Sequence, residues 1–324
     1  MELQVDRIPT FEYSTKIDAQ CKTLSAYLRD CRNISNRSVK IRLHKISRLK
    51  SIHSTLLIES NGLTLDTMRN LINGKTVEGP FDEIVEAKNA IAAYDLMDKV
   101  DLSSEEDFLK VESVMMWALV PANGYRDGMV GVYNGSEWEY IAPPAEMVPE
   151  MIDRLFGWFK GTGYPPFITG AIIHAYIEFI HPFRDGNGRM GRIWHNEILK
   201  RSEKVFSLIS IEDLIRENQQ TYYDVLKACQ QDMDCTPFVE FCLDLLIARL
   251  AQISELSNDR VAEVLSKMDG EFVSASDLMK KLRLSNRSNF LKNYLRPAIA
   301  CGFVEMSDPE HPHAHDQKYR SNLF

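Results

Sequence analysis

The sequence lacks the features of a membrane or disulfide-stabilised protein. No apolar run approaches the roughly 20 residues that span a bilayer. The first residues, MELQVDRIPTFEYS, include acids and no apolar core, so we expect no signal peptide. The six cysteines have no metal-type spacing and fit reduced thiols better than a disulfide framework. We therefore expect a soluble, cytoplasmic protein that does not bind membranes.

Extreme charge and biased composition are also missing. The 38 Lys and Arg residues against 46 Asp and Glu give a net charge of −8, which argues against a surface coated with bases for nucleic acid. A local basic patch remains open. Apolar residues make up 44% and charged residues 26%, a balance that excludes wholesale disorder. The length of 324 residues is about twice a usual domain, so two domains are the first expectation.

Strands are scarce, and most of the chain has the periodicity of helices. Antiparallel strands are predicted in the first three quarters only between Met129 and Ile141, on either side of Asn134-Gly135, a strong hairpin signal. Helices are predicted over 13–28, 32–58, 80–99, 146–159, 166–180, from 187 onward and over 217–250. The sequence thus predicts a mainly α body from which one β-hairpin projects.

The pattern changes near Ser257. Helices are predicted over 258–268, over 277–282 with Ser274 or Ser276 as cap, and from the turn at 285–286 through Tyr294. Strands are predicted from Phe303 and over 317–319. Two helices, a turn, a third helix and a two-stranded wing describe a winged helix-turn-helix over 257–324.

Residues 280–296 of this region contain six bases and no acid, as a recognition helix would. Two partners stay open at this point: DNA, bound through the basic helix, or a protein that the domain docks. A second acid-free basic stretch, 32–58, is interpreted as a solvated helix face, with nucleic acid or an acidic partner as the alternative.

The segment that carries chemistry is HPFRDGNGRMGR, from His181 to Arg192. An apolar helix leads to His181, and the following proline directs the chain out of helical geometry. Gly186 and Gly188 flank Asn187 where a new helix begins. Unpaired N–H groups and the helix dipole at such a start favour phosphate.

The charged residues of this segment complete a polyphosphate site. Arg189 and Arg192 lie one helical turn apart beside the glycine loop, where two guanidinium groups suit phosphates. Asp185 offers the hard oxygen ligand that Mg²⁺ on a nucleotide requires. His181 is a base that accepts a proton near neutrality. The sequence therefore predicts phosphoryl or nucleotidyl transfer, with Mg²⁺ bound on a nucleotide.

This segment resembles the core motif of the Fic family, His-Pro-Phe-x-Asp/Glu-Gly-Asn-Gly/Lys-Arg-x-x-Arg, with every defined position filled. The resemblance implies a helical Fic fold and transfer of AMP from ATP to a Tyr, Ser or Thr hydroxyl of a target protein. It assigns His181 as the base and Asp185 as the Mg²⁺ ligand. It further implies that Asn187 and the backbone of Gly186 and Gly188 form the anion hole, that Arg189 and Arg192 grip the β/γ phosphates, and that Phe183 anchors the loop in the core.

Two further segments resemble parts of the same family. The hairpin at 129–141, after Gly124-Tyr125-Arg126, resembles the family's flap, whose edge would hold an extended target segment. Residues 218–223 resemble the stretch that contacts the adenine, with Tyr223 as the candidate residue.

A segment upstream, 55–61, resembles the family's inhibitory helix, Ser/Thr-x-x-x-Glu-Gly/Asn. Thr55 and Glu59 fill the pattern, while Ser60 stands in place of Gly or Asn. The resemblance implies that Glu59 pairs with Arg192 and occupies the space of the γ-phosphate. The enzyme would then be autoinhibited.

The sequence as a whole predicts three regions: an N-terminal helical region (1–100) with the inhibitory segment, a Fic catalytic core (101–250) and the winged helix (257–324). Three alternative functions stay open. The chain would be a DNA-binding regulator whose Fic domain senses nucleotide, a Fic enzyme with another phosphoryl-containing donor, or an enzyme that removes AMP with the help of Glu59. A homo-oligomer is possible.

Overall fold

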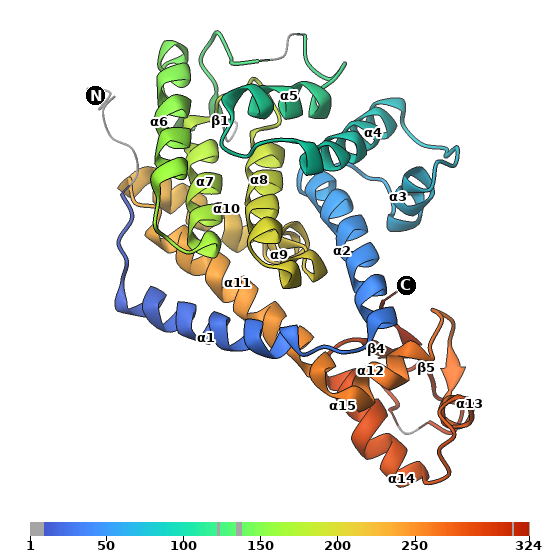
Figure 1. The fold of residues 1–324 in the computed structure, drawn as a ribbon. Helices are drawn as coiled ribbons and strands as arrows, with labels where there is room; N and C mark the ends of the chain where they lie inside the picture. Colours follow the sequence, from blue (N-terminus) through green and yellow to red (C-terminus); the bar gives the residue numbers. More distant parts are fainter. Residues whose placement is uncertain (1–9, 122–123, 134–137, 313, 324) are drawn as a thin grey trace. The chain divides into compact units, whose positions relative to one another are not determined.

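The protein is mainly helical (Figure 1), and its computed structural model describes residues 10–121, 124–133, 138–312 and 314–323. Contacts divide the chain into two compact units. The first comprises Met1–Asp18, Arg48–Phe206 and Ser210–Leu245, and the second Ala19–Ser47, Ser207–Ile209 and Leu246–Phe324. Within the described part, no helix is both long and apolar enough to cross a bilayer.

These units are not the three predicted regions. Residues 19–47 cluster with the C-terminal part of the chain and not with the rest of 1–100. Helices α1 (Thr15–Arg32), α2 (Arg37–Ile58) and α11 (Thr236–Ser254) each contribute residues to both units. The division into 1–100, 101–250 and 257–324 stays a prediction.

The first unit contains the helices that carry the motif. Besides its share of α1, α2 and α11, it comprises α3 (Leu65–Ile72), α4 (Phe81–Leu96), η1 (Met97–Lys99), α5 (Glu105–Met115), β1 (Gly131–Tyr133), β2 (Trp138–Ile141), η2 (Ala145–Met147), α6 (Val148–Gly161), α7 (Pro166–Ile180), α8 (Asn187–Ser202), α9 (Ile211–Glu217) and α10 (Gln219–Asp232). The short helix η3 (Lys204–Leu208) has residues in both units. The predicted antiparallel hairpin is present as β1 and β2, with Gly131 opposite Ile141. Its predicted turn at Asn134-Gly135 lies outside the described residues.

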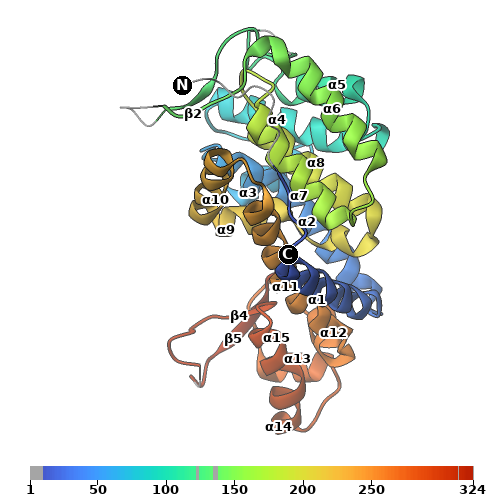
Figure 2. The same ribbon diagram turned by 90° about the vertical axis from the view of Figure 1, so that its left-hand side faces the viewer.

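Helices α7 and α8 run side by side at the centre of this unit (Figures 1 and 2). Two glycines allow the close approach. A Cβ on Gly170 of α7 would lie 2.6 Å from the ring of His195 on α8, and a Cβ on Gly191 of α8 would lie 2.5 Å from the ring of His174 on α7. Each histidine thus fills the space that the opposite glycine leaves. The loop that joins the two helices therefore has both ends fixed by tight packing.

The two histidines are packing residues. Both rings are fully buried. Burial disfavours the charged form, and it lowers the pKa of His195 to about 3 and that of His174 well below its usual range. His174 Nε2 lies 3.1 Å from the hydroxyl of Tyr222. Both imidazoles are consequently neutral at physiological pH.

A buried carboxylate, Glu212 at the start of α9, anchors the second half of α2. Ser51 of α2 donates to it at 2.8 Å, Tyr94 of α4 at 2.7 Å and Asn196 of α8 at 2.7 Å. Ser210, one residue before α9, donates at 3.1 Å. A single acceptor group thus joins four elements, among them the helix that Glu59 directly follows. This part of α2 is held independently of the ion pair that Glu59 makes.

The prediction of one helix over 217–250 was wrong. Met233 adopts a left-handed conformation (φ 54°) that ends α10, and α11 begins at Thr236. Asp234 Oδ1 accepts hydrogen bonds from the backbone N–H of Thr236 at 3.0 Å and from its hydroxyl at 2.7 Å, which fixes the turn. Sequence analysis missed this break because the left-handed residue is a methionine and not a glycine. It also missed α3, α5 and α9.

In the second unit, helices pack beside a small sheet. Besides its share of the long helices, the unit contains η4 (Glu255–Ser257), α12 (Asp259–Ser266), β3 (Val273–Ser274), α13 (Ala275–Lys281), α14 (Arg287–Phe290), η5 (Leu291–Leu295), α15 (Arg296–Ala300), β4 (Val304–Met306) and β5 (Lys318–Ser321). The strands are antiparallel in the order β3-β5-β4. Ser274 caps α13 by accepting from Asp277 N–H, as predicted.

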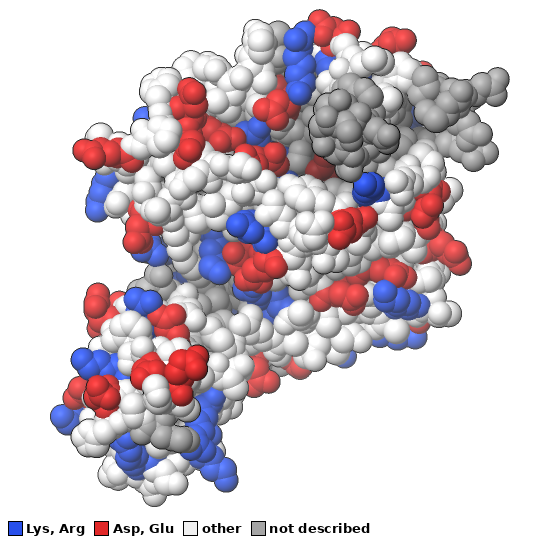
Figure 3. Space-filling model, turned by 180° about the vertical axis from the view of Figure 1, so that it is seen from behind, with Lys and Arg blue, Asp and Glu red and all other residues white. Residues whose placement is uncertain are grey.

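Two features of this unit differ from expectation. The sheet has a third strand, β3, and the last helical stretch continues past Tyr294 to Ala300, through a π-helical turn at η5. Figure 3 shows acidic and basic side chains interspersed on the exposed face of this unit. Lys280 pairs with Asp277 at 3.3 Å, and Lys281 with Asp269 at 3.4 Å, so part of the basic stretch is locally neutralised. The winged helix and its DNA or protein partner stay predictions.

We predict that Glu212→Ala lowers the free energy of unfolding by about 3 kcal/mol. The substitution leaves several buried donors without their acceptor, and each such group costs ~1–3 kcal/mol. The midpoint of urea unfolding measures the change. The matched control is Glu150→Ala, which removes an exposed pair with Arg154 on α6, and a change within about 0.5 kcal/mol is expected. Equal effects of the two substitutions would contradict the anchoring role of Glu212.

Candidate active site

The loop between α7 and α8 is shaped by two left-handed residues. His181 ends α7 with φ 49° and ψ 59°, and Gly186 precedes α8 with φ 83°. At Gly186 any side chain would also collide with the core, because a Cβ there would lie 2.5 Å from Met116 Sδ. The glycine is therefore required by conformation and by space.

Asn187 and Phe183 hold this loop closed. The Asn187 side chain accepts from Phe183 N–H at 2.9 Å and donates to Phe183 O at 3.0 Å. The Phe183 ring is fully buried, with its centroid 5.2 Å from that of Phe108. Phe183 thus anchors the loop as predicted. The Asn187 amide shapes the loop, and the first N–H groups of α8, which have no acceptor within the helix, are the donors left for an anion.

His181 is oriented to act as a base. Its ring Nδ1 lies 3.3 Å from the backbone carbonyl oxygen of Glu178, one turn back in α7. A carbonyl oxygen only accepts, so this contact favours the tautomer with the proton on Nδ1. The unprotonated Nε2 is then available as a proton acceptor, as the predicted role of His181 requires.

Asp185 has the exposure and the chemistry of a metal ligand. Its side chain is 58% exposed. One carboxylate oxygen accepts from Gly186 N–H at 2.6 Å, and the other lies 3.2 Å from Arg189 Nη2. Among the described residues, no group of three or more His, Cys, Asp and Glu is placed to hold a metal ion alone. A single carboxylate fits Mg²⁺ that arrives with a nucleotide, because such Mg²⁺ takes most of its ligands from phosphates and water.

The two motif arginines are both buried and both paired with carboxylates. Arg192 Nη2 lies 2.5 Å from Glu59 Oε1, and its Nε donates to Thr55 Oγ1 at 3.0 Å. Burial alone would lower the pKa of Arg192, but the Glu59 carboxylate raises it above its usual range. Arg189 donates to Glu86 on α4. The structure thus brings Thr55, Glu59 and Arg192 together as predicted, whereas Glu86 was not expected.

The Glu59 carboxylate lies at the start of α8, where the anion site is expected. A Cβ on Gly188 would lie 2.8 Å from Glu59 Oε1 and 2.8 Å from Arg192 Nη1. The same point is 3.2 Å from Glu178 Oε1, a second carboxylate of the site whose pKa burial raises. Sequence analysis missed Glu178. Its signal is an acidic residue within an otherwise apolar helix, three positions before His181.

The conformation of Ser60 explains why the family pattern has Gly or Asn directly after the glutamate. Ser60 is left-handed, with φ 69°. Ser60 N–H donates to Leu57 O at 3.1 Å, and Asn61 N–H to Leu56 O at 3.1 Å, which are the two bonds of a Schellman motif. Gly and Asn adopt this conformation at the lowest cost. Ser60 therefore departs from the pattern in residue type while it keeps the backbone geometry.

Tyr223 lies next to the end of α2, in front of Glu59. Its side chain is exposed, and its hydroxyl donates to the carbonyl oxygen of Ile58 at 3.4 Å. Gln219, one turn before it on α10, donates to the same carbonyl at 3.3 Å. The predicted contact of Tyr223 with adenine stays a prediction.

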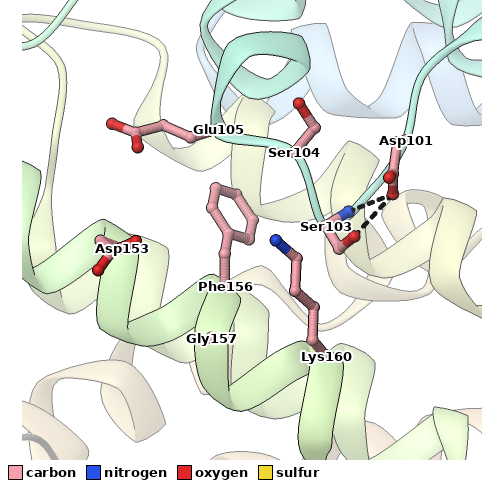
Figure 4. A pocket seen from close by; sticks show the side chains of 8 residues that line it. All are labelled: Asp101, Ser103, Ser104, Glu105, Asp153, Phe156, Gly157 and Lys160. Carbon is pink, nitrogen blue, oxygen red and sulfur yellow. Dashed lines mark hydrogen bonds between the residues drawn. The ribbon is translucent and has the colours of Figure 1, made fainter.

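A pocket of about 280 Å³ lies apart from the motif (Figure 4). It lies between the start of α5 and α6, and it is lined by Asp101, Ser103, Ser104, Glu105, Asp153, Phe156, Gly157 and Lys160. None of the predicted site residues lines it. The pocket therefore has no part in the site.

Comparisons with known families and structures identify the family of the chain. Residues 102–199 match the Fic/DOC family, and residues 259–321 match the C-terminal domain of "Filamentation induced by cAMP protein Fic-like". A crystal structure of a Fic family protein from Desulfovibrio desulfuricans G20 is 35% identical, with a TM-score of 0.72, over 97% of this chain and 98% of that one. The chain belongs to the Fic family.

More distant Fic proteins share part of the chain. The protein named "Protein adenylyltransferase Fic" from Culex quinquefasciatus is 26% identical over 63% of this chain and 41% of its own length. Its namesake from Drosophila melanogaster is 24% identical over 78% of this chain and 52% of its own length. This Fic protein thus spans about half the length of these relatives. A Fic-1 structure from C. elegans, 22% identical with a TM-score of 0.60, shares the fold.

We predict that Ser60→Gly raises the free energy of unfolding by up to about 1 kcal/mol. The left-handed conformation costs ~1–2 kcal/mol for a residue with a Cβ, and glycine gives back ~0.5–1 kcal/mol through the entropy of the unfolded chain. Urea unfolding measures the change. The control is Ser202→Gly in the last turn of α8, which we expect to be destabilising by about 0.5–1 kcal/mol. Destabilisation by both substitutions would contradict the capping geometry.

Proposed function

We propose that this Fic protein is a protein adenylyltransferase, which transfers AMP from ATP to a Tyr, Ser or Thr hydroxyl of a target protein and of itself. The observation that carries the proposal is the arrangement at the start of α8. There a base, an exposed carboxylate, free backbone N–H groups and two arginines surround one loop, which is the equipment that nucleotidyl transfer needs. The relatives named protein adenylyltransferase support the same reaction.

In the proposed reaction His181 Nε2 removes the proton from the target hydroxyl, whose oxygen then attacks the α-phosphorus of ATP while pyrophosphate leaves. The first N–H groups of α8 stabilise the charge on the phosphate oxygens. Asp185 would hold Mg²⁺, which neutralises phosphate charge when it is bound. Arg192, once free of Glu59, and Arg189 bind the β/γ end.

The target segment is proposed to pair with the edge of the flap. β1 and β2 form a two-stranded ribbon whose outer edges have no further strand in the described part of the chain. Extended peptides add to such edges through backbone hydrogen bonds. The exposed side chains of Met129 and Ile141 flank this ribbon and offer apolar contacts to the target.

We further propose that Glu59 keeps the enzyme inactive. Its carboxylate neutralises Arg192 and places negative charge beside Gly188, where the γ-phosphate would otherwise bind. Phosphate is repelled there, so ATP binds without its productive alignment. The buried hydrogen bonds of Glu212 hold the body of α2 in place, so activation requires only that the Glu59 side chain leaves the site.

The test is transfer of label from α-phosphate-labelled ATP to the protein itself. We expect Glu59→Gly to raise the labelling rate at least about tenfold over wild type. A tenfold change corresponds to an activation free energy that is only about 1.4 kcal/mol lower. Glu59→Gln keeps the shape of the side chain and removes its charge, so an intermediate gain is expected.

His181→Ala in the Glu59→Gly background is expected to abolish labelling, because it removes the base. Equal labelling of wild type and Glu59→Gly would contradict the autoinhibition. Labelling that persists without His181 would contradict the proposed reaction.

A further inference from the structure

The C-terminal end of α7 is capped by side chains from the flap region. The last carbonyl groups of a helix have no partner within it and must find donors elsewhere. Arg126 Nε donates to His181 O at 2.7 Å, and its Nη2 lies 3.3 Å from Ile180 O. The Arg126 backbone N–H donates to Pro182 O at 3.0 Å. Arg126 thus donates hydrogen bonds to three consecutive backbone carbonyl groups, those of Ile180, His181 and Pro182.

The same guanidinium group closes the base of the hairpin. Arg126 Nη1 donates to Gly128 O at 2.9 Å, and Nη2 donates to Pro143 O. Gly128 precedes β1, and Pro143 follows β2. Arg126 is therefore bonded at once to both ends of the flap and to the backbone of His181.

Tyr140 makes a second link from the flap to α7. It lies on β2, and its hydroxyl donates to the carbonyl oxygen of Phe179, two residues before His181. Its ring also packs on Phe179, with centroids 6.1 Å apart. The hydrogen bonds of Arg126 and Tyr140 together cover the carbonyl groups from Phe179 to Pro182.

Arg126 carries a buried positive charge whose partners are backbone carbonyl oxygens. The residue is 3% exposed, and among the described residues it has no carboxylate within ion-pair distance. Its positive charge is stabilised instead by carbonyl oxygens, including those at the negative end of the α7 dipole. One guanidinium group supplies donors to four backbone carbonyl oxygens, and these hydrogen bonds offset the cost of removing its charge from water.

His181 needs such support because its backbone is strained. A residue with a Cβ in the left-handed region costs about 1–3 kcal/mol and persists only where its surroundings enforce it. The hydrogen bond from Arg126 to His181 O fixes the peptide plane that follows the ring. A change in this plane would rotate the imidazole away from the target hydroxyl.

We propose that Arg126 is a positioning residue, assisted by Tyr140, that couples the target-binding flap to the orientation of His181. A target segment that pairs with the flap is then aligned with His181, because the flap and the backbone of His181 are hydrogen-bonded to the same guanidinium group. The inference rests on the proposed function for its catalytic consequence, and on the geometry alone for the mechanical coupling.

The catalytic test uses the Glu59→Gly protein, so that inhibition does not limit the rate. We expect Arg126→Lys in this background to lower the rate constant of self-labelling at saturating ATP by about 10²-fold, the cost of a ~1 Å misplacement. The KM for ATP should change less than about twofold, because Arg126 touches none of the predicted phosphate-binding residues. Tyr140→Phe, which removes one hydroxyl, should give a smaller loss of the same kind.

The matched control is Arg154→Lys on α6, an exposed arginine paired with Glu150, which should leave both constants unchanged. Full labelling rates in both the Arg126→Lys and Tyr140→Phe proteins would overturn the proposal. A KM for ATP that worsens in step with the rate constant would also overturn it, because general loss of structure would then explain the effect.

Hydrogen–deuterium exchange tests the coupling without activity. In Arg126→Lys the amides of Ala142 at the flap base and of Phe183 in the loop should exchange faster together, while amides within α8 keep their wild-type rates. Faster exchange at Ala142 alone would overturn the coupling. Absence of labelling in Glu59→Gly itself would overturn the proposed function, and the exchange result would still decide the role of Arg126.

Discussion

The ion pair between Glu59 and Arg192 joins the end of α2 to the start of α8, and the state of the site depends on it. Arg192 is almost fully buried, and its Nη2 lies 2.5 Å from the Glu59 carboxylate, whose place the phosphates of ATP would take in the proposed reaction. Under the proposed inhibition these two groups compete for one position, because Glu59 lies against Gly188, where the helix N-terminus favours an anion. The proposal therefore treats the buried charge pair as a switch.

The surrounding fold limits what can move. α7 and α8 are locked by reciprocal glycine–histidine packing, and the loop between them is closed by Asn187. The body of α2 is held by the hydrogen bonds of Glu212, whereas Glu59 follows the last residue of that helix and is followed by the left-handed Ser60. The rigid parts thus carry His181 and the glycine loop, and Glu59 stands at the end of a helix. The proposed activation therefore needs a movement of the Glu59 side chain and no unfolding of α2.

The sequence predicted the interactions between residues that lie close together in the chain better than those between distant residues. From His181 to Arg192, spacing alone places the base, the glycine loop and the arginines around one helix start, and the structure has this arrangement. The helical fold and the hairpin followed from periodicity and from Asn134-Gly135. Glu59 lies 133 residues before Arg192, and only the resemblance to the family's inhibitory pattern connected them.

The contacts that sequence analysis missed join distant elements through groups with no local signature. Glu86 reaches Arg189 across 103 residues, and Arg126 reaches His181 across 55. A lone arginine or glutamate on a helix or loop is most often solvated, so nothing in the sequence marks Glu86 or Arg126 as a partner of the motif. The break at Met233 was missed for a related reason, because tertiary contacts impose a left-handed conformation that the residue type does not favour.

The central claim is that Glu59 occupies the space of the γ-phosphate, and calorimetric binding of ATP and of ADP tests it most directly. ADP has no γ-phosphate, so the account predicts that Glu59→Gly strengthens the binding of ATP and leaves that of ADP nearly unchanged. The ratio of the affinity for ATP to the affinity for ADP should therefore be higher in Glu59→Gly than in wild type. The same ratio in wild type and in Glu59→Gly would contradict the account, because Glu59 would then not lie where the γ-phosphate binds.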